Sequence, residues 1–154
     1  MSIKNGFRIP FVFLLGLLLT PLILACTTDD HNWTDQDRKA SDHYYNTQRA
    51  NREASRQINK AGNRFSPQEK ASIRALTLYA LTEAQAIDDA FLDKVHPNFK
   101  THFRGEFQAA LEMALHNLDS PDYNTAKKST ELFSNFVDWY NENRPDIHMP
   151  DLKH

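Results

Sequence analysis

The sequence is poor in the residues from which many binding and catalytic sites are built. It contains one cysteine and four glycines in 154 residues, so disulfide frameworks and glycine-rich phosphate-binding loops have little material. It lacks Gly-x-Ser-x-Gly, Ser-x-x-Lys and His-Glu-x-x-His, the patterns of common hydrolases and zinc proteases. A formal net charge of -2 gives no electrostatic reason to expect nucleic acid as a partner. We therefore expect no catalytic residues, no metal, no cofactor and no nucleic acid.

The overall composition is that of one globular domain. Hydrophobic residues make up 40% of the chain and charged residues 25%, which excludes collagen-like, low-complexity and wholly disordered proteins. The length suits a single domain with its own core and is too short for two.

The first 26 residues have the layout of an export signal. Lys4 and Arg8 precede an apolar run over residues 9–25, which ends at the single cysteine, Cys26. Ile-Leu-Ala-Cys at residues 23–26 resembles the lipobox of bacterial lipoproteins, in which a small residue precedes a cysteine that becomes the mature N-terminus.

This resemblance implies that residues 1–25 are removed as a signal peptide and that Cys26 is lipidated. A diacylglycerol is expected on its sulfur and an acyl chain such as palmitate on its amine, and two or more chains anchor a protein stably in a bilayer. Residues 26–33 then form the lipid anchor and tether. Because Thr27 rather than aspartate follows the cysteine, the resemblance implies the outer membrane, facing the periplasm, if the cell has two membranes. An uncleaved anchor and a secreted protein with a free thiol remain the alternatives.

The mature chain has the pattern of an all-α protein. Alanine and leucine recur at helical spacing, and no stretch alternates in the manner of a strand. We predict a compact antiparallel bundle of about four helices over residues 34–143, followed by an irregular tail over residues 144–154. The tail either docks along the bundle or frays. The expected helical segments are 35–61, 67–94, 98–118 and one that starts after Pro121 and ends near Asn143.

Local signals mark where the first two segments begin and end. Thr34 is a typical N-cap, and Gly62 with Asn63 is a typical stop. Ser-Pro-Gln-Glu at residues 66–69 is a capping box with proline at the first helical position, which predicts a helix start.

Helical periodicity also predicts which faces are buried. Phe99, Phe103 and Phe107 share one side of the third segment, and Phe133, Phe136 and Val137 share one side of the fourth. The second segment is apolar nearly all round, so we expect it to be the central helix, covered on both sides. The first has a narrow, alanine-rich stripe and is expected to pack closely but weakly.

The first segment carries the main candidate interaction site. Opposite its apolar stripe, six side chains fall within about 80° of one another on the helix. We call this set the basic ridge: Arg38, Tyr45, Arg49, Arg52, Arg56 and Lys60. One interpretation is contact with anionic headgroups or an acidic protein. The other is a solvated helix face, partly neutralised by Asp42 and Glu53.

Two further clusters have simpler interpretations. One set in the third segment has side chains that can bind zinc: His102, Glu106, Glu112 and His116. This set lies opposite the phenylalanine stripe, where we expect solvent rather than the ordered hydrogen-bond partners that hold the ligands of a zinc site. The second set is Asp88, Asp89 and Asp93. It resembles only loosely the aspartate-rich motif of prenyl-transferring enzymes, because its spacing is one residue too long. We expect these aspartates on the solvent-exposed edge of the second segment.

These patterns together favour an envelope lipoprotein that acts by binding another protein without catalysis. Within that class an immunity or exclusion role is favoured, because a small tethered bundle can cap an incoming protein by surface complementarity alone. A structural or accessory subunit of a secretion or cell-wall assembly is the first alternative. A periplasmic small-ligand carrier or enzyme, with a cavity between the second, third and fourth helices, is the second.

Overall fold

The computed structural model describes residues 32–62 and 64–150. The predicted signal segment, Cys26 and most of the predicted tether lie outside these residues. The described residues form helices joined by turns, and no strand occurs among them, which confirms the all-α class. None of the described helices is both long and apolar enough to cross a bilayer.

The first helix begins and ends at the predicted residues. α1 spans Asp35–Ala61. The Thr34 hydroxyl accepts a hydrogen bond from the Asp37 amide at 3.1 Å, and the Asp37 carboxylate accepts one from the Thr34 amide at 2.8 Å, a reciprocal pair that satisfies two free donors. At the other end Gly62 has a φ of 65°, a left-handed conformation that glycine adopts without strain.

The second helix begins as predicted but ends earlier. α2 spans Pro67–Ala86, with the Ser66 hydroxyl accepting from the Glu69 amide at 3.2 Å. The prediction of one helix to residue 94 was wrong, because Ile87 is extended and a separate helix, α3 (Asp89–Val95), follows.

The remaining helices follow the predicted segments closely. α4 (Phe99–His102), a π-helical turn η1 (Phe103–Gln108) and α5 (Ala109–Asp119) succeed one another without interruption, so the third expected segment contains a wider π turn at its centre. α6 spans Tyr123–Asn143 and is capped by Asp122, whose carboxylate accepts from the Thr125 amide at 2.7 Å.

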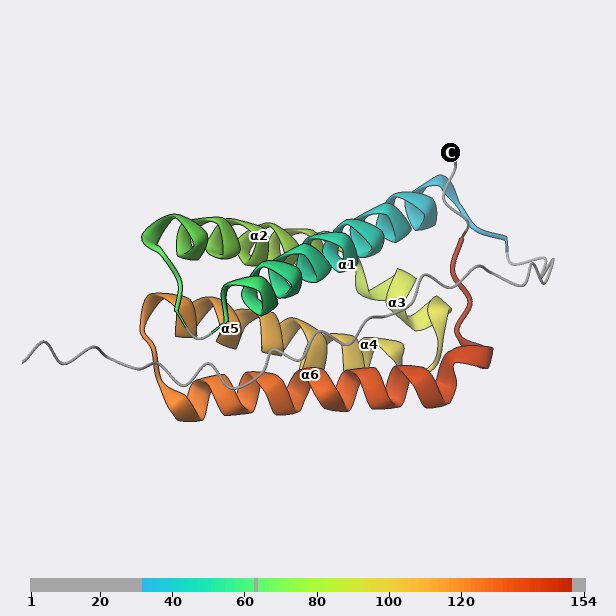
Figure 1. The fold of residues 1–154 in the computed structure, drawn as a ribbon. Helices are drawn as coiled ribbons and strands as arrows, with labels where there is room; N and C mark the ends of the chain where they lie inside the picture. Colours follow the sequence, from blue (N-terminus) through green and yellow to red (C-terminus); the bar gives the residue numbers. More distant parts are fainter. Residues whose placement is uncertain (1–31, 63, 151–154) are drawn as a thin grey trace, which may run out of the picture.

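The helices are arranged in two layers (Figure 1). α1 lies beside α2 in one layer, α5 lies beside α6 in the other, and α2 packs on α5. α3 and α4 lie at the end of the molecule where the chain passes from the first layer to the second.

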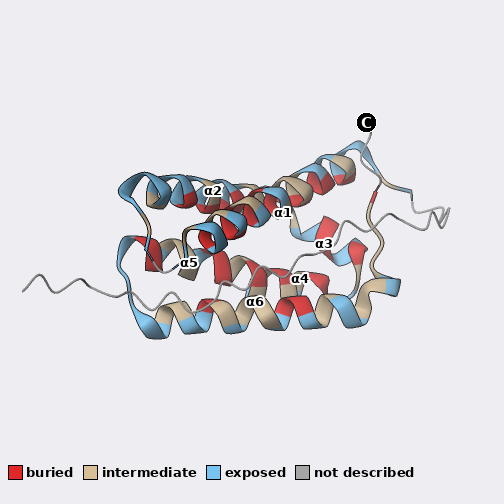
Figure 2. Cartoon of the chain, viewed as in Figure 1, coloured by how far each residue is buried: buried red, intermediate tan, exposed pale blue. Residues whose placement is uncertain are grey.

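The faces of the helices that turn toward the interior are buried (Figure 2), and phenylalanines are the largest of the fully buried side chains. The predicted phenylalanine stripe is fully buried, with ring centroids 5.8 Å apart for Phe99 and Phe103 and 5.4 Å apart for Phe103 and Phe107. Phe136 of α6 lies 5.0 Å from Phe107. Trp33, which we assigned to the tether, packs on Phe91 at 6.0 Å and therefore belongs to the domain.

The described part of the tail docks on the bundle. A single 3₁₀ turn, η2 (Arg144–Asp146), ends α6. Beyond it the His148 amide donates to the Val95 carbonyl at 3.2 Å, and the Ser41 hydroxyl donates to the Pro150 carbonyl at 3.2 Å. Residues 144–150 are therefore held against α1 and the end of α3 and do not fray.

The expectation that α2 is covered on both sides was wrong. Its inner face packs on α1 and α5, but Leu78 and Tyr79 on its outer face are 43% and 45% exposed. Apolar residues on both sides of α2 are typical of a central helix. In the two-layer arrangement, however, no other described helix covers the outer side of α2.

Candidate functional site

The orientation of α1 is fixed by its contacts with α2. Glu83 of α2 accepts a hydrogen bond from Asn46 at 2.9 Å and contacts the Nδ1 atom of His43 at 3.0 Å. Burial raises the pKa of Glu83, but the bonds from Asn46 and His43 outweigh it and hold that pKa below its usual value. Because this flank of α1 faces α2, helical spacing directs the basic ridge to the other flank.

The structure places the basic ridge on the surface, with two half-buried members. Arg49, Arg52, Arg56 and Lys60 are exposed, and Arg38 is half-buried. Tyr45 is also half-buried and packs against the main core, with its ring centroid 5.8 Å from that of Tyr44. The cations therefore form the outer surface of α1, whereas Tyr45 contributes part of its area to the core.

The charges of the basic ridge are unequally neutralised. Arg56 donates two hydrogen bonds to Glu53, at 2.8 and 2.7 Å, which lower the pKa of that carboxyl to about 2. Arg49 donates to the Asn46 side-chain oxygen at 2.8 Å. Within residues 32–62 and 64–150, neither Arg52 nor Lys60 forms an ion pair.

A polar hollow lies along the middle of the basic ridge. It has a volume of about 480 Å³, and the described residues that line it are Asp42, Tyr45, Asn46, Gln48, Arg49 and Arg52. The guanidinium groups of Arg49 and Arg52 suit a ligand that brings acceptor oxygens, such as carboxylates.

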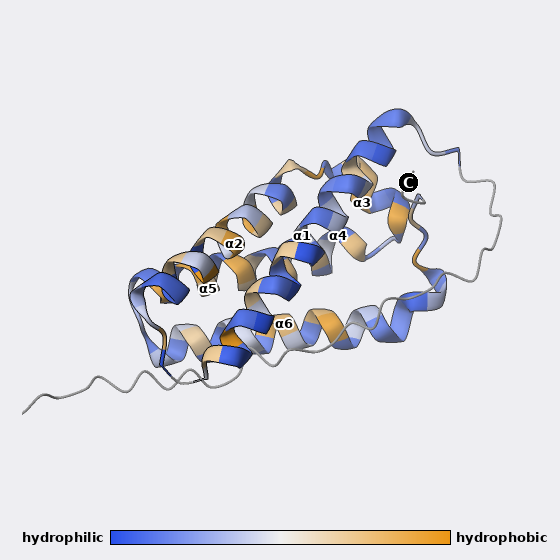
Figure 3. Ribbon diagram, turned by 45° about the horizontal axis from the view of Figure 1, so that its top comes forward, coloured by the Kyte–Doolittle hydropathy of each residue, from blue (hydrophilic) through white to orange (hydrophobic). Residues whose placement is uncertain are grey.

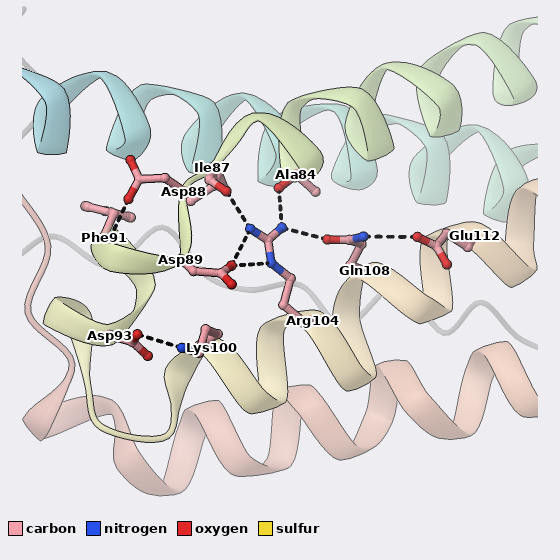
Figure 4. Close-up of polar contacts among 10 residues, drawn as sticks. All are labelled: Ala84, Ile87, Asp88, Asp89, Phe91, Asp93, Lys100, Arg104, Gln108 and Glu112. Carbon is pink, nitrogen blue, oxygen red and sulfur yellow. Dashed lines mark hydrogen bonds and ion pairs between the residues drawn. The ribbon is translucent and has the colours of Figure 1, made fainter.

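The predicted aspartate cluster is bound by structural contacts (Figure 4). The Asp88 carboxylate caps α3 by accepting from the Phe91 amide at 2.7 Å, Asp89 pairs with Arg104 at 2.9 Å, and Asp93 pairs with Lys100 at 2.6 Å. Each carboxylate thus has a partner within the fold, and together these contacts stabilise the junction between α2, α3 and the helices that follow.

Arg104 is the organising residue of this junction, and no pattern in the sequence had indicated it. Its guanidinium donates to the Ala84 carbonyl at 2.9 Å, to the Ile87 carbonyl, to Asp89, and to the Gln108 side chain at 2.7 Å (Figure 4). It therefore adds a strong donor to the backbone carbonyls around the end of α2. The polar Asp-Asp pair directly after Ile87 was the available sign that a helix ends there.

A second missed contact joins the start of α1 to α3. The buried Asp37 carboxylate accepts from the Lys94 ammonium with both oxygens, each at 2.8 Å. Burial raises the pKa of Asp37, but hydrogen bonds from Lys94 and Thr34 outweigh it, and the pKa lies below its usual value.

The histidine and glutamate set of the third segment is divided in the structure. His102 is half-buried, stacks on Trp139 at 4.3 Å and contacts Glu106 at 2.9 Å, whereas Glu112 and His116 are exposed. The expectation of a fully solvated face was therefore wrong for the first pair. No group of three or more metal-binding side chains occurs among the residues that the structure describes.

An apolar cavity lies between α1, α5 and α6, close to where the sequence analysis placed the cavity of a ligand carrier. It has a volume of about 30 Å³ and is lined by residues such as Ala54, Leu111 and Phe133. Small-molecule pockets commonly measure about 300–1,000 Å³, so this cavity is too small for a ligand of metabolite size.

Comparisons of the chain with protein-family models, with curated proteins and with solved structures found no match.

Proposed function

We propose that this chain is a lipid-anchored envelope protein that binds another protein without catalysis, in an immunity or exclusion role. The compact antiparallel bundle of about four helices is its scaffold, and Cys26 is its attachment to the bilayer. The proposed location is the outer membrane, facing the periplasm, if the cell has two membranes.

The observation that carries the proposal is the exposed, incompletely neutralised charge of the basic ridge. Arg52 and Lys60 have no ion-pair partner in residues 32–62 and 64–150, whereas an aspartate elsewhere in the fold pairs with each of Arg74, Lys94, Lys100 and Arg104. An acidic partner would supply the missing counter-charges.

The position of α1 in the chain supports contact near the membrane. α1 begins at Asp35, and the preceding tether from Cys26 reaches at most roughly 30 Å when fully extended. A partner that engages the basic ridge would therefore be held close to the bilayer. This geometry suits a protein that intercepts a molecule arriving at the envelope.

The test is a pull-down of the intact lipoprotein from its own membranes. Arg49→Glu with Arg52→Glu should reduce partner recovery at least about tenfold, because like charge would face an acidic surface. Lys127→Glu with Lys128→Glu is the matched control, since it reverses two exposed cations on α6, and it should leave recovery unchanged. Equal recovery with both pairs would refute the role of the ridge.

The anchor and the type of partner are tested in the same preparation. Intact-mass measurement should show an N-terminus at Cys26 that carries acyl chains, and an unmodified cysteine would refute the anchor. Recovery of one incoming secreted protein supports immunity or exclusion. Recovery of a resident multi-subunit envelope complex would instead favour the accessory-subunit alternative.

A further inference from the structure

The basic ridge is not evenly charged along α1. The helix is hydrophilic along most of its length (Figure 3), but a carboxylate interrupts the cations. One row of side chains runs along this flank, each about one turn from the next: Arg49, Glu53, Arg56 and Lys60. The position of Glu53 in this row places a negative charge near the middle of the ridge.

Three donors hold the Glu53 carboxylate. It accepts two hydrogen bonds from the Arg56 guanidinium, at 2.8 and 2.7 Å, and one from the Gln57 amide at 3.0 Å. Arg49, one turn toward the start of the helix, donates instead to Asn46. We call Glu53, Arg56 and Gln57 the closed unit, because the charge of its arginine is balanced within it.

On both sides of the closed unit the ridge has cations without an ion pair in the part of the chain that the structure describes. Arg49 and Arg52 precede it, and Lys60 follows it. Hydrogen bonds from Ser66 lower the pKa of Glu69, and the nearby charge of Lys60 adds to this effect. The Glu69 carboxylate is nevertheless bound to the Ser66 amide and hydroxyl, each at 2.8 Å, so Lys60 remains open to a partner.

We propose that the closed unit divides the basic ridge into two cationic positions, which select an acidic protein with carboxylates in two groups about 12–17 Å apart. This inference rests on the proposed function of the ridge. A carboxylate placed over Glu53 would meet like charge, whereas carboxylates over Arg52 and Lys60 would meet open cations. Repulsion at the middle of the ridge therefore weakens the binding of uniformly acidic surfaces.

The separation follows from the geometry of the helix and indicates the kind of partner. At a rise of about 1.5 Å per residue, Lys60 lies about 12 Å from Arg52 and about 17 Å from Arg49 along the axis. On a partner helix this distance corresponds to acidic residues about 8–11 positions apart. In an extended segment about four or five residues cover it. A small anion cannot reach both cationic positions, so we expect the surface of a protein.

The first test removes the closed unit without a change in net charge. Glu53→Gln with Arg56→Gln should leave recovery of the partner, in the pull-down from native membranes, within about twofold of wild type, because this pair offers no open charge. Arg49→Gln with Arg52→Gln should lower recovery at least about fivefold, because it removes one of the two cationic positions.

A matched control accounts for the change in net charge of the second variant. Lys127→Gln with Lys128→Gln removes two exposed cations from α6 and should leave recovery unchanged. A loss for the closed-unit variant as large as that for the Arg49 and Arg52 variant would overturn the proposal, since the closed unit would then contact the partner directly. If no ridge variant changes recovery, the proposed function of the ridge fails and this inference fails with it.

The second test measures selectivity without the native partner. The probe is fluorescein-labelled poly-L-glutamate, a uniformly acidic polymer, mixed with the full-length protein in non-ionic detergent micelles at low ionic strength, where exposed charges are least screened. Glu53→Gln should raise the affinity measured by fluorescence anisotropy at least about threefold, because it removes like charge and frees Arg56.

Glu131→Gln is the matched control for the polymer. Glu131 is the exposed carboxylate that pairs with Lys127 and Lys128 on α6, and its replacement changes the net charge by the same amount. It should raise the affinity less than about 1.5-fold, because the basic ridge is unaltered. Equal gains for the two variants, or no gain for Glu53→Gln, would overturn the proposal even if the Arg49 and Arg52 variant still loses the partner.

Discussion

The two regions richest in charge use arginine in opposite ways. At the junction of α2 and α3, Arg104 is half-buried, and its guanidinium is divided among backbone carbonyls, Asp89 and Gln108. On the basic ridge, Arg52 is exposed and makes no ion pair within the described part of the chain. The first arrangement stabilises the fold, and the second leaves charge available to a partner. The same residue type therefore has a structural or a recognition role according to the carbonyl and carboxylate oxygens within its reach.

Removal of the junction arginine should have the largest effect on stability. Arg104→Ala removes the side-chain donor of the Ala84 and Ile87 carbonyls, of which Ala84 keeps the Ile87 amide at 3.4 Å. We expect a loss of about 2–4 kcal/mol in the free energy of unfolding. Chemical denaturation followed by circular dichroism measures it.

Arg74→Ala is the matched control for the junction. Arg74 also makes two hydrogen bonds to one carboxylate, that of Asp119, but the pair is on the surface and reaches no backbone carbonyl. Its removal should cost at most about 1 kcal/mol. Equal losses for the two variants would show that backbone capping by Arg104 contributes nothing beyond the ion pair.

Replacement of the buried aspartate should have an intermediate, pH-dependent effect. Asp37→Asn weakens the bonds from Lys94 and Thr34, at an expected cost of about 1–3 kcal/mol near neutral pH. The pKa of Asp37 is lower in the folded protein than its ordinary value. Its stabilisation is therefore complete above the ordinary value of 3.8 and is lost as pH falls through the folded value.

The difference in unfolding free energy between wild type and Asp37→Asn should accordingly shrink on acidification below about pH 4. Asp138→Asn, at an exposed position of α6, should differ from wild type by less than about 0.5 kcal/mol across the range. A constant gap for Asp37→Asn at all pH values would contradict the charged contact with Lys94.

The smallest effect on stability is expected on the basic ridge. Arg52→Glu should change the unfolding free energy by less than about 0.5 kcal/mol, because the side chain is exposed and makes no ion pair in the described residues. Thermal melting of the variant measures this. A loss as large as that of Arg104→Ala would show that the ridge supports the fold and would remove the contrast between the two regions.

Local signals predicted the helix ends, and contacts between distant segments decided what those signals missed. Thr34, Gly62 and the capping box at Ser66 were read correctly because each acts within a few residues of its own position. The break after Ala86 was missed because it depends on a distant residue. Arg104, which donates to the Ile87 carbonyl, lies 17 residues further along the chain. Helical periodicity identified the buried phenylalanine stripe but could not show whether one or both sides of α2 are covered.

The candidate site shows the same division. Helical spacing was sufficient to gather the ridge cations on one flank of α1, since that grouping depends only on 3.6 residues per turn. Spacing did not reveal that Tyr45 packs toward the core, or that Arg56 is neutralised while Arg52 is not.

The sequence by itself determined the helical class, the main helix ends and the residues that share a face, because capping and periodicity are local properties of the chain. The tertiary structure decided which charges are paired, where α2 ends and which of its faces stays uncovered. Those outcomes depend on which side chains from other helices come within hydrogen-bonding or van der Waals distance, and that is set only when the two layers pack.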